Sequence, residues 1–270
     1  MNDLLLTHLL ELQKELDQQG IHPILGGGLS LYLRQTYLPY HSTRYPFEVQ
    51  TRSTNDIDLF LNAQLIVDKN QIEKLKNVLR SLRYEVVPEA KNFQFSKSVD
   101  LFGQKREIKI DLLSAPPPPE DLQKVEIHKP RIKPIGVSDF HAYLTPEADG
   151  IEIGAVEMEI QEQKFHIPSA YNYLILKLNA FDDRKERNDK DSDYGRHHAY
   201  DIFAMVTQMD EKEWKKAKTH FEVHREQEYL KKTCQIQKEC FSKMSDLGLI
   251  RLQENSAYKN QKTEFTPYLH

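Results

Sequence analysis

Segment 56–61 (DIDLFL) alternates two aspartates with apolar residues. A period of two predicts a β-strand, because successive side chains of a strand point to opposite faces. One face of this strand is strongly apolar, and the other face carries Asp56 and Asp58 side by side. The fold must therefore contain a sheet that buries the apolar face and tolerates two neighbouring carboxylates.

Two interpretations of the paired aspartates are open at this point. In a central strand the carboxylates repel each other and are poorly solvated, so a cation between them would relieve the repulsion. Mg²⁺ suits such a pair, because it takes one or two protein carboxylates and completes its coordination with water and substrate phosphates. In an edge strand, by contrast, Asp56 and Asp58 would simply be solvated.

Composition limits the class of protein. The 270 residues are enough for one large domain or two small ones, and 39% hydrophobic and 29% charged residues are ordinary for a soluble globular protein. No apolar run approaches the roughly 18 residues of a membrane span. Segment 1–20 is too charged for a signal peptide, and Cys234 and Cys240 indicate neither a disulfide framework nor a zinc site. We therefore expect a cytoplasmic protein, whose net charge of −4 excludes only a uniformly basic nucleic-acid surface.

A glycine turn precedes the aspartate strand. Residues 2–19 show helical spacing of leucines, Gly20 is a C-cap candidate, and 21–25 predicts a short strand. The strand enters Gly26–Gly28, and a helix is expected from Leu29. A strand, a glycine turn and a helix start can direct backbone N–H groups at a phosphate. The alternative interpretation is a simple tight turn.

The next region contains a third strand-borne aspartate. Residues 36–51 are expected to form a long loop whose aromatic and basic side chains contact either a substrate or each other. In segment 106–113 the apolar residues again share one face, so Asp111 projects from the other. The proline run 116–119 ends this segment.

The remaining predictions for the first half are a helix at 69–83, strands at 84–87 and 93–101, and short strands within 121–167. The expected short strands are 151–153, 156–160 and 164–167.

The chain becomes helical after Pro168. A helix that begins after Ser169 contains Lys177 among leucines and isoleucine, and a second helix at 197–209 contains Asp201 beside an equally apolar run. A charged loop at 182–196 joins them, one or two lysine-rich helices follow at 210–245, and a polar tail, expected to be partly disordered, covers 251–270. On spacing alone, Lys177 and Asp201 form either a salt bridge between two helices or a phosphate-holding lysine with an aspartate that orients it.

The order of these features resembles the nucleotidyltransferase superfamily that includes DNA polymerase beta, and more closely its AbiEii/MenT-like branch of toxins from type IV toxin–antitoxin systems. The resemblance spans residues 24–206. The pieces that carry it are Gly27-Gly28-Leu29-Ser30, Arg52-Ser53-Thr54-Asn55-Asp56-Ile57-Asp58-Leu59, Leu176-Lys177-Leu178-Asn179-Ala180 and Tyr200-Asp201-Ile202. One departure is the Gly27-Gly28 pair, where the superfamily usually has Gly-Ser.

The resemblance implies a metal-dependent enzyme that moves a nucleoside monophosphate from an NTP to an acceptor hydroxyl. It implies an active site made of Asp56, Asp58, Asp111, Lys177 and Asp201. The three strand aspartates would bind Mg²⁺ or Mn²⁺, with Asp111 alternatively accepting a proton. Nucleotide phosphates would be held by Gly27, Gly28, Ser30 and Lys177. RNA, foremost a tRNA 3′ end, is the implied acceptor, and a cognate antitoxin protein is a possible partner.

We therefore predict an α/β (α+β) fold with a nucleotidyltransferase-type mixed sheet, flanking helices and a mainly helical C-terminal domain. The predicted domains are 1–167 and 168–270. Arg184, Lys185 and Arg187 are the candidates for docking the acceptor. Two other functions are open: a small-molecule nucleotidyltransferase of the antibiotic-modifying kind, and a catalytically inactive module with the same fold.

Overall fold

The computed structural model of the chain combines a mixed sheet with a largely helical second half, as predicted for the fold class. It describes residues 3–38, 43, 49, 51, 54, 56–90, 92–101, 104–186 and 193–259. The chain divides into two compact units, residues 1–37 with 53–169, and residues 38–52 with 170–270. Each unit is described by itself.

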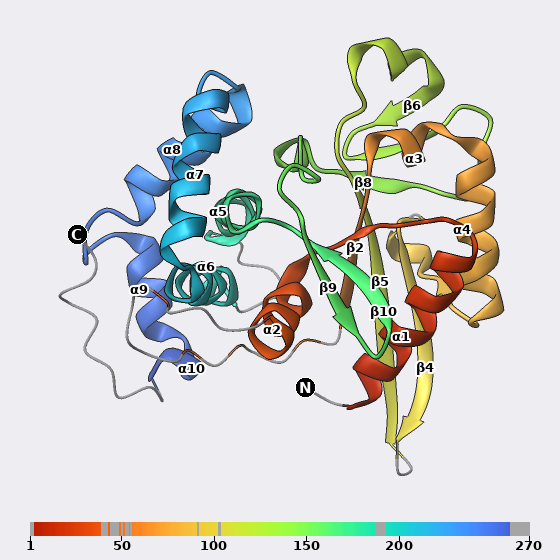
Figure 1. The fold of residues 1–270 in the computed structure, drawn as a ribbon, viewed down its shortest axis with the longest axis horizontal. Helices are drawn as coiled ribbons and strands as arrows, with labels where there is room; N and C mark the ends of the chain where they lie inside the picture. Colours follow the sequence, from red (N-terminus) through yellow and green to blue (C-terminus); the bar gives the residue numbers. More distant parts are fainter. Residues whose placement is uncertain are drawn as a thin grey trace. The chain divides into compact units, whose positions relative to one another are not determined.

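The N-terminal unit is built on one mixed sheet (Figure 1). Its strands are β1 (Ile24–Leu25), β2 (Asp56–Leu61), β3 (Glu85–Val86), β4 (Gln94–Leu101), β5 (Gln104–Ser114), β6 (Val125–His128), β7 (Arg131–Pro134), β8 (Ala142–Leu144), β9 (Val156–Ile160) and β10 (Gln163–Ile167). The order is β6-β7-β8-β5-β2-β1-β10-β9, and β4 pairs with both β3 and β5. Because β1 and β5 flank β2, the edge-strand interpretation of the two aspartates is wrong.

Helices cover both faces of this sheet. The helices are α1 (Asp3–Gln18), α2 (Gly27–Tyr37), α3 (Ala63–Val67) and α4 (Lys69–Ser81). Figure 1 shows α1, α3 and α4 on one face and α2 on the other. Gly27 at the start of α2 lies against Asp58, so the apolar side of β2, with buried Ile57, Leu59 and Leu61, is turned to the face that carries α1 and α4. The aspartate side therefore faces α2.

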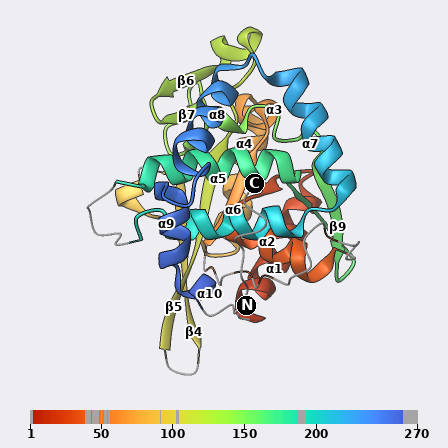
Figure 2. The same cartoon turned by 90° about the vertical axis from the view of Figure 1, so that its left-hand side faces the viewer.

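The β4–β5 hairpin extends beyond the neighbouring strands, as Figure 2 shows. Its register is continuous from the pair Gln94–Asp111 to the pair Leu101–Gln104. This long antiparallel pairing fixes which side chains of β4 lie beside those of β5.

The second unit contains six helices within the residues described. They are α5 (Ala170–Arg184), α6 (Arg196–Gln208), α7 (Glu211–His224), α8 (Glu228–Cys240), α9 (Leu247–Glu254) and α10 (Ser256–Lys259). Helix α5 packs against α6, α7 and α8, and α6 packs against α9. The predicted helices after Ser169 and at 197–209 are thus confirmed.

One local prediction, the strand at 151–153, is wrong. Residues 151–153 form a turn, in which the Ile153 amide donates to the Gly150 carbonyl at 2.8 Å, because Gly150 adopts a left-handed φ of 68°. Within the predicted polar tail, α9 ends at Glu254 and α10 covers Ser256–Lys259, and Leu249 and Leu252 of α9 are buried. Most of the expected loop 36–51, and residues 260–270 of the expected disordered tail, lie outside the described residues. No helix in the described ranges is both long enough and apolar enough to cross a membrane.

Candidate active site

Strand register brings two of the predicted carboxylates together. In the parallel pairing of β2 with β5, Asp58 lies directly beside Asp111, and Asp56 lies beside Lys109. Paired residues of neighbouring strands project from the same face of a sheet. Asp58 and Asp111 are both partly exposed, whereas Asp56 is exposed. The sheet therefore places two like charges next to each other on the face that α2 covers.

The glycine turn approaches Asp58 closely. The Gly26 amide donates to the Asp58 carbonyl at 2.9 Å, and a Cβ added to Gly27 would lie 1.7 Å from Oδ2 of Asp58. Gly27 also has a left-handed φ of 63°, which disfavours any other residue. Glycine is thus required at position 27 both by the backbone conformation and by the carboxylate beside it.

Helix α2 begins at this carboxylate. Its first backbone hydrogen bond runs from the Ser30 amide to the Gly26 carbonyl at 3.1 Å. The amides of Gly27, Gly28 and Leu29 therefore belong to the first turn, where N–H groups have no partner inside the helix and where the helix dipole favours an anion. These amides could meet a phosphate, as predicted for Gly27 and Gly28.

The hydroxyl of Ser30, in the same turn, already has a hydrogen-bond partner. Its side chain is buried, and its hydroxyl donates to the Gly27 carbonyl at 3.0 Å. The hydroxyl would have to leave this bond to reach a phosphate, so the predicted phosphate contact of Ser30 stays a prediction.

Asp111 is held in an unfavourable electrostatic environment. Burial raises the pKa of Asp111 to about 6, and the neighbouring charge of Asp58 adds to the effect. A hydrogen bond from Nε2 of Gln94 to Oδ1 of Asp111, at 2.6 Å, lowers the pKa in part. The charge on Asp111 is therefore only partly compensated by the protein itself, which is the condition that a bound cation relieves.

Gln94 is a residue of this site that the sequence did not reveal. It pairs directly with Asp111 across the β4–β5 hairpin, so one face carries Gln94, Asp111 and Asp58 in a row over three strands. The strand that contains Gln94 is predictable from its alternation. The pairing of Gln94 with Asp111 is not predictable, because it depends on the register of the hairpin.

The carboxylates fit a divalent cation in number and in type. Among the residues that the structure describes, no group of three or more His, Cys, Asp or Glu side chains forms a metal-binding cluster. Asp58 and Asp111 alone supply the one or two carboxylates that Mg²⁺ commonly takes from a protein, with water and substrate completing its coordination. Metal binding by Asp56, Asp58 and Asp111 stays a prediction.

The C-terminal unit brings Lys177 and Asp201 together. Nζ of Lys177 lies 2.7 Å from Oδ2 of Asp201, and the two side chains are 7% and 0% exposed. The ammonium also lies 5.4 Å from the centre of the Tyr173 ring. The salt-bridge interpretation of this pair is confirmed, since it joins α5 to α6. The phosphate role of Lys177 stays a prediction.

The acceptor-docking candidates lie at and beyond the end of α5. Arg184 is exposed, whereas Lys185 is tied to Asp182 by an ion pair of 2.7 Å. Arg187 lies outside the described residues. A docking role for these residues stays a prediction.

Comparison with known proteins finds similarity only at the level of overall structure. No protein-family model matches the sequence, and no curated protein matches it significantly. The antibiotic-resistance factor ANT(2'')-Ia is 11% identical, with a TM-score of 0.43 over 83% of this chain and 95% of that chain. An antigenic nucleotidyltransferase-like protein from Paracoccidioides brasiliensis is 16% identical, with a TM-score of 0.39 over 87% and 94%. Scores this low carry no argument about activity, which must come from the residues of this chain.

The contact between Gly27 and Asp58 can be tested with a matched pair of glycines. Gly20 and Gly27 have nearly equal left-handed φ values of 69° and 63°, but a Cβ at Gly20 would meet nothing within 4 Å. Gly20→Ala should cost about 1–2 kcal/mol of unfolding free energy from backbone strain alone. Gly27→Ala should cost about 1–3 kcal/mol more, because the new Cβ displaces the carboxylate. Equal losses in urea unfolding would show that Asp58 does not constrain position 27.

The raised pKa of Asp111 predicts a pH dependence of stability. The native-state value of about 6 exceeds the ordinary 3.8, so the native protein binds the proton more tightly than the unfolded chain does. Stability from this group is therefore lost as pH rises from about 4 to 6. In EDTA, Asp111→Asn should raise the unfolding free energy more at pH 7 than at pH 5, by about 1 kcal/mol.

The control for this measurement is Asp149→Asn, which changes an exposed aspartate outside the cluster. Urea unfolding of both variants at the two pH values checks the prediction. A gain for Asp111→Asn that does not change with pH would contradict it.

Lys177→Met separates a structural role from a nucleotide role. The change leaves Asp201 buried without its cation and should cost about 3–5 kcal/mol of unfolding free energy. Adding Asp201→Asn to Lys177→Met should recover part of the loss, because no charge then remains buried. A nucleotide titration of the folded double variant tests the predicted phosphate contact. Unchanged affinity for NTP would remove Lys177 from the nucleotide site.

Proposed function

We propose that the chain is a metal-dependent nucleotidyltransferase that moves a nucleoside monophosphate from an NTP to an acceptor hydroxyl. The observation that carries this proposal is the register of Asp58 beside Asp111 on parallel strands, with Gly27 packed against Asp58 at the start of α2. Two adjacent carboxylates next to a helix N-terminus offer a cation site and a phosphate site side by side.

In this proposal Asp58 and Asp111 hold Mg²⁺ or Mn²⁺, and exposed Asp56 adds a third carboxylate. The bound cation would neutralise charge on the phosphates and orient the α-phosphate for in-line attack. The first-turn amides of α2, including those of Gly27 and Gly28, bind phosphate oxygens, and the absence of side chains there permits close approach. Gln94 holds one oxygen of Asp111 in place. Asp111 is also the group best prepared to take a proton from the acceptor hydroxyl, because its pKa lies near neutrality.

The identity of the acceptor, the branch of the superfamily and the partner are supported by the sequence resemblance alone. We propose that the acceptor is RNA, with a tRNA 3′ end as the leading candidate, and that the enzyme belongs to the AbiEii/MenT-like branch with a cognate antitoxin as partner. Lys177 and Asp201 complete the active site in that branch, and Arg184, Lys185 and Arg187 would contact the acceptor. A reducing cytoplasm is the proposed location, and both cysteines are free thiols.

The decisive experiment is a labelling assay. The protein is incubated with each α-³²P-labelled NTP, Mg²⁺ and either total RNA or total protein, and the labelled fraction is identified. We expect label in RNA, and we expect Asp58→Asn to reduce this labelling at least about 100-fold, because a carboxylate pair that holds a catalytic cation is essential to transfer. The melting temperature of the variant should not fall, because the substitution removes the repulsion between Asp58 and Asp111.

Glu159→Gln serves as the matched control, because it removes an exposed carboxylate of edge strand β9. Normal turnover by Asp58→Asn would refute the assigned mechanism. Label in a small hydroxylated compound but not in RNA would favour the antibiotic-modifying alternative. Absence of any labelled product would favour a binding module.

A further inference from the structure

Two imidazoles of the second unit lie on one face of α7. This helix contains His220 and His224, which are four residues apart. Side chains at positions i and i+4 project from the same face of a helix, one turn apart. The centres of the two rings are 6.4 Å apart, with their planes inclined by 58°. The helix therefore holds two nitrogen ligands next to each other, outside the proposed active site.

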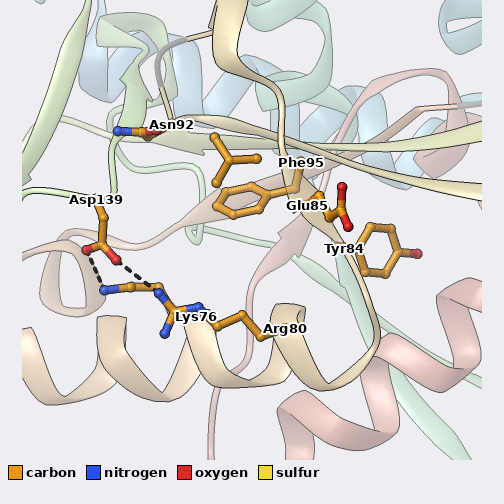
Figure 3. A pocket seen from close by; sticks show the side chains of 8 residues that line it. Lys76, Arg80, Tyr84, Glu85, Asn92, Phe95 and Asp139 are labelled. Carbon is orange, nitrogen blue, oxygen red and sulfur yellow. Dashed lines mark hydrogen bonds and ion pairs between the residues drawn. The ribbon is translucent and has the colours of Figure 1, made fainter.

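Among the described residues, no hydrogen bond or ion pair involves either imidazole. Other ionisable side chains bind one another: in the pocket between α4, β3 and β4, for example, Lys76 and Arg80 both bind Asp139 (Figure 3). His220 and His224 are both partly exposed, so solvent reaches the two rings. The imidazoles are therefore accessible to an ion from solution.

Helix α5 restricts one of the two rings. Helices α5 and α7 pack against each other, and Tyr171 of α5 meets His220 edge to face, with 5.6 Å between the ring centres. Burial raises the pKa of the Tyr171 hydroxyl, so this neighbour is uncharged at neutral pH. A ring that packing already holds loses less side-chain entropy when it binds a ligand. His220 is thus partly pre-organised, with His224 one turn further along the helix.

Two histidines one helical turn apart form a chelating pair for transition metals. The same spacing occurs in the H-E-x-x-H pattern, in which two histidines of one helix bind zinc. Imidazole suits Zn²⁺, Ni²⁺ and Cu²⁺, whereas Mg²⁺ prefers oxygen ligands. Within the described ranges of the chain, no third His, Cys, Asp or Glu completes a cluster with the pair. An ion held here would therefore keep several coordination positions open to water.

We propose that His220 and His224 bind one divalent late transition-metal ion (Zn²⁺, Ni²⁺ or Cu²⁺), with water in the remaining positions. Each imidazole is neutral when it binds the ion, and each supplies one ring nitrogen. Bonds from zinc to nitrogen are about 2.0–2.1 Å long, so the rings must turn toward each other, and their partial exposure permits this. The nitrogen ligands make this site selective against the Mg²⁺ of the proposed active site.

The test is a metal titration of the full chain in excess Mg²⁺, which keeps oxygen sites occupied. The protein is first freed of bound metal with EDTA and then transferred to buffer without chelator. ZnCl₂, NiCl₂ and CuCl₂ are titrated separately by isothermal calorimetry. We expect a saturable site for at least one of the three ions. The same ion should raise the melting temperature, because it binds the folded helix in preference to the unfolded chain.

A relocated histidine provides the matched control. His224→Gln should weaken binding at least about tenfold, because a single imidazole cannot chelate the ion. Combining Glu222→His with His224→Gln keeps the number of histidines but places the two imidazoles on different faces of α7. This double variant should bind as weakly as His224→Gln alone. His128→Gln, which removes an exposed histidine of β6, should leave the affinity unchanged. Circular dichroism verifies that each variant is folded.

Three results would overturn the proposal: none of the three ions binds saturably, the double variant binds as tightly as the unchanged chain, or excess Mg²⁺ prevents binding. The test involves neither nucleotide nor transfer. Its failure and a failure of the proposed function are therefore separate outcomes.

Discussion

The repulsion between Asp58 and Asp111 is the constraint on which the rest of the N-terminal unit depends. Register places the two carboxylates side by side on central strands, where water reaches them only in part. Such a contact is unfavourable, so the strands must be held by other interactions. Strands β2 and β5 are held in place by burial of the apolar face of β2 and by hydrogen bonds to neighbouring strands on both sides. Apolar burial and strand pairing thus stabilise the sheet, and the repulsion between the two carboxylates reduces that stability.

The sequence predicts the parts of this arrangement that depend on local periodicity. Alternation in 56–61 and 106–113 identifies β2 and β5 and the faces of their aspartates, because successive side chains of a strand point to opposite faces of the sheet. The glycine turn is predictable for the same local reason. The neighbour relation between Asp58 and Asp111 is not local, since 52 residues and two further strands separate them along the chain. It entered the prediction through the resemblance to a family.

Errors and omissions cluster where the local signal is weak. Gln94 is not predictable as a site residue, because a glutamine on a strand indicates no particular function until its cross-strand partner is known. Segment 151–153 alternates like a strand, yet Gly150 turns the chain back on itself there. Lys177 and Asp201 were correctly paired, because each sits in an apolar helix and a buried charge requires an opposite one. Burial predicted that pair, but burial alone does not distinguish a structural pair from a catalytic one.

The carboxylates on the two sides of β4 differ in how their charges are compensated: Asp139, on a loop, is half exposed, whereas Asp111, on β5, is partly buried. On one face Asp139 is bound by Lys76 and Arg80, and the hydrogen bond from Lys76 holds its pKa below the ordinary range. On the other face the neutral amide of Gln94 donates a hydrogen bond to Asp111, another carboxylate lies beside it, and burial raises the pKa of Asp111 to about 6. A fold that needed Asp111 only for stability could have supplied a cation there, as it does for Asp139. The unbalanced charge on the α2 face is therefore the feature on which the proposed cation site rests.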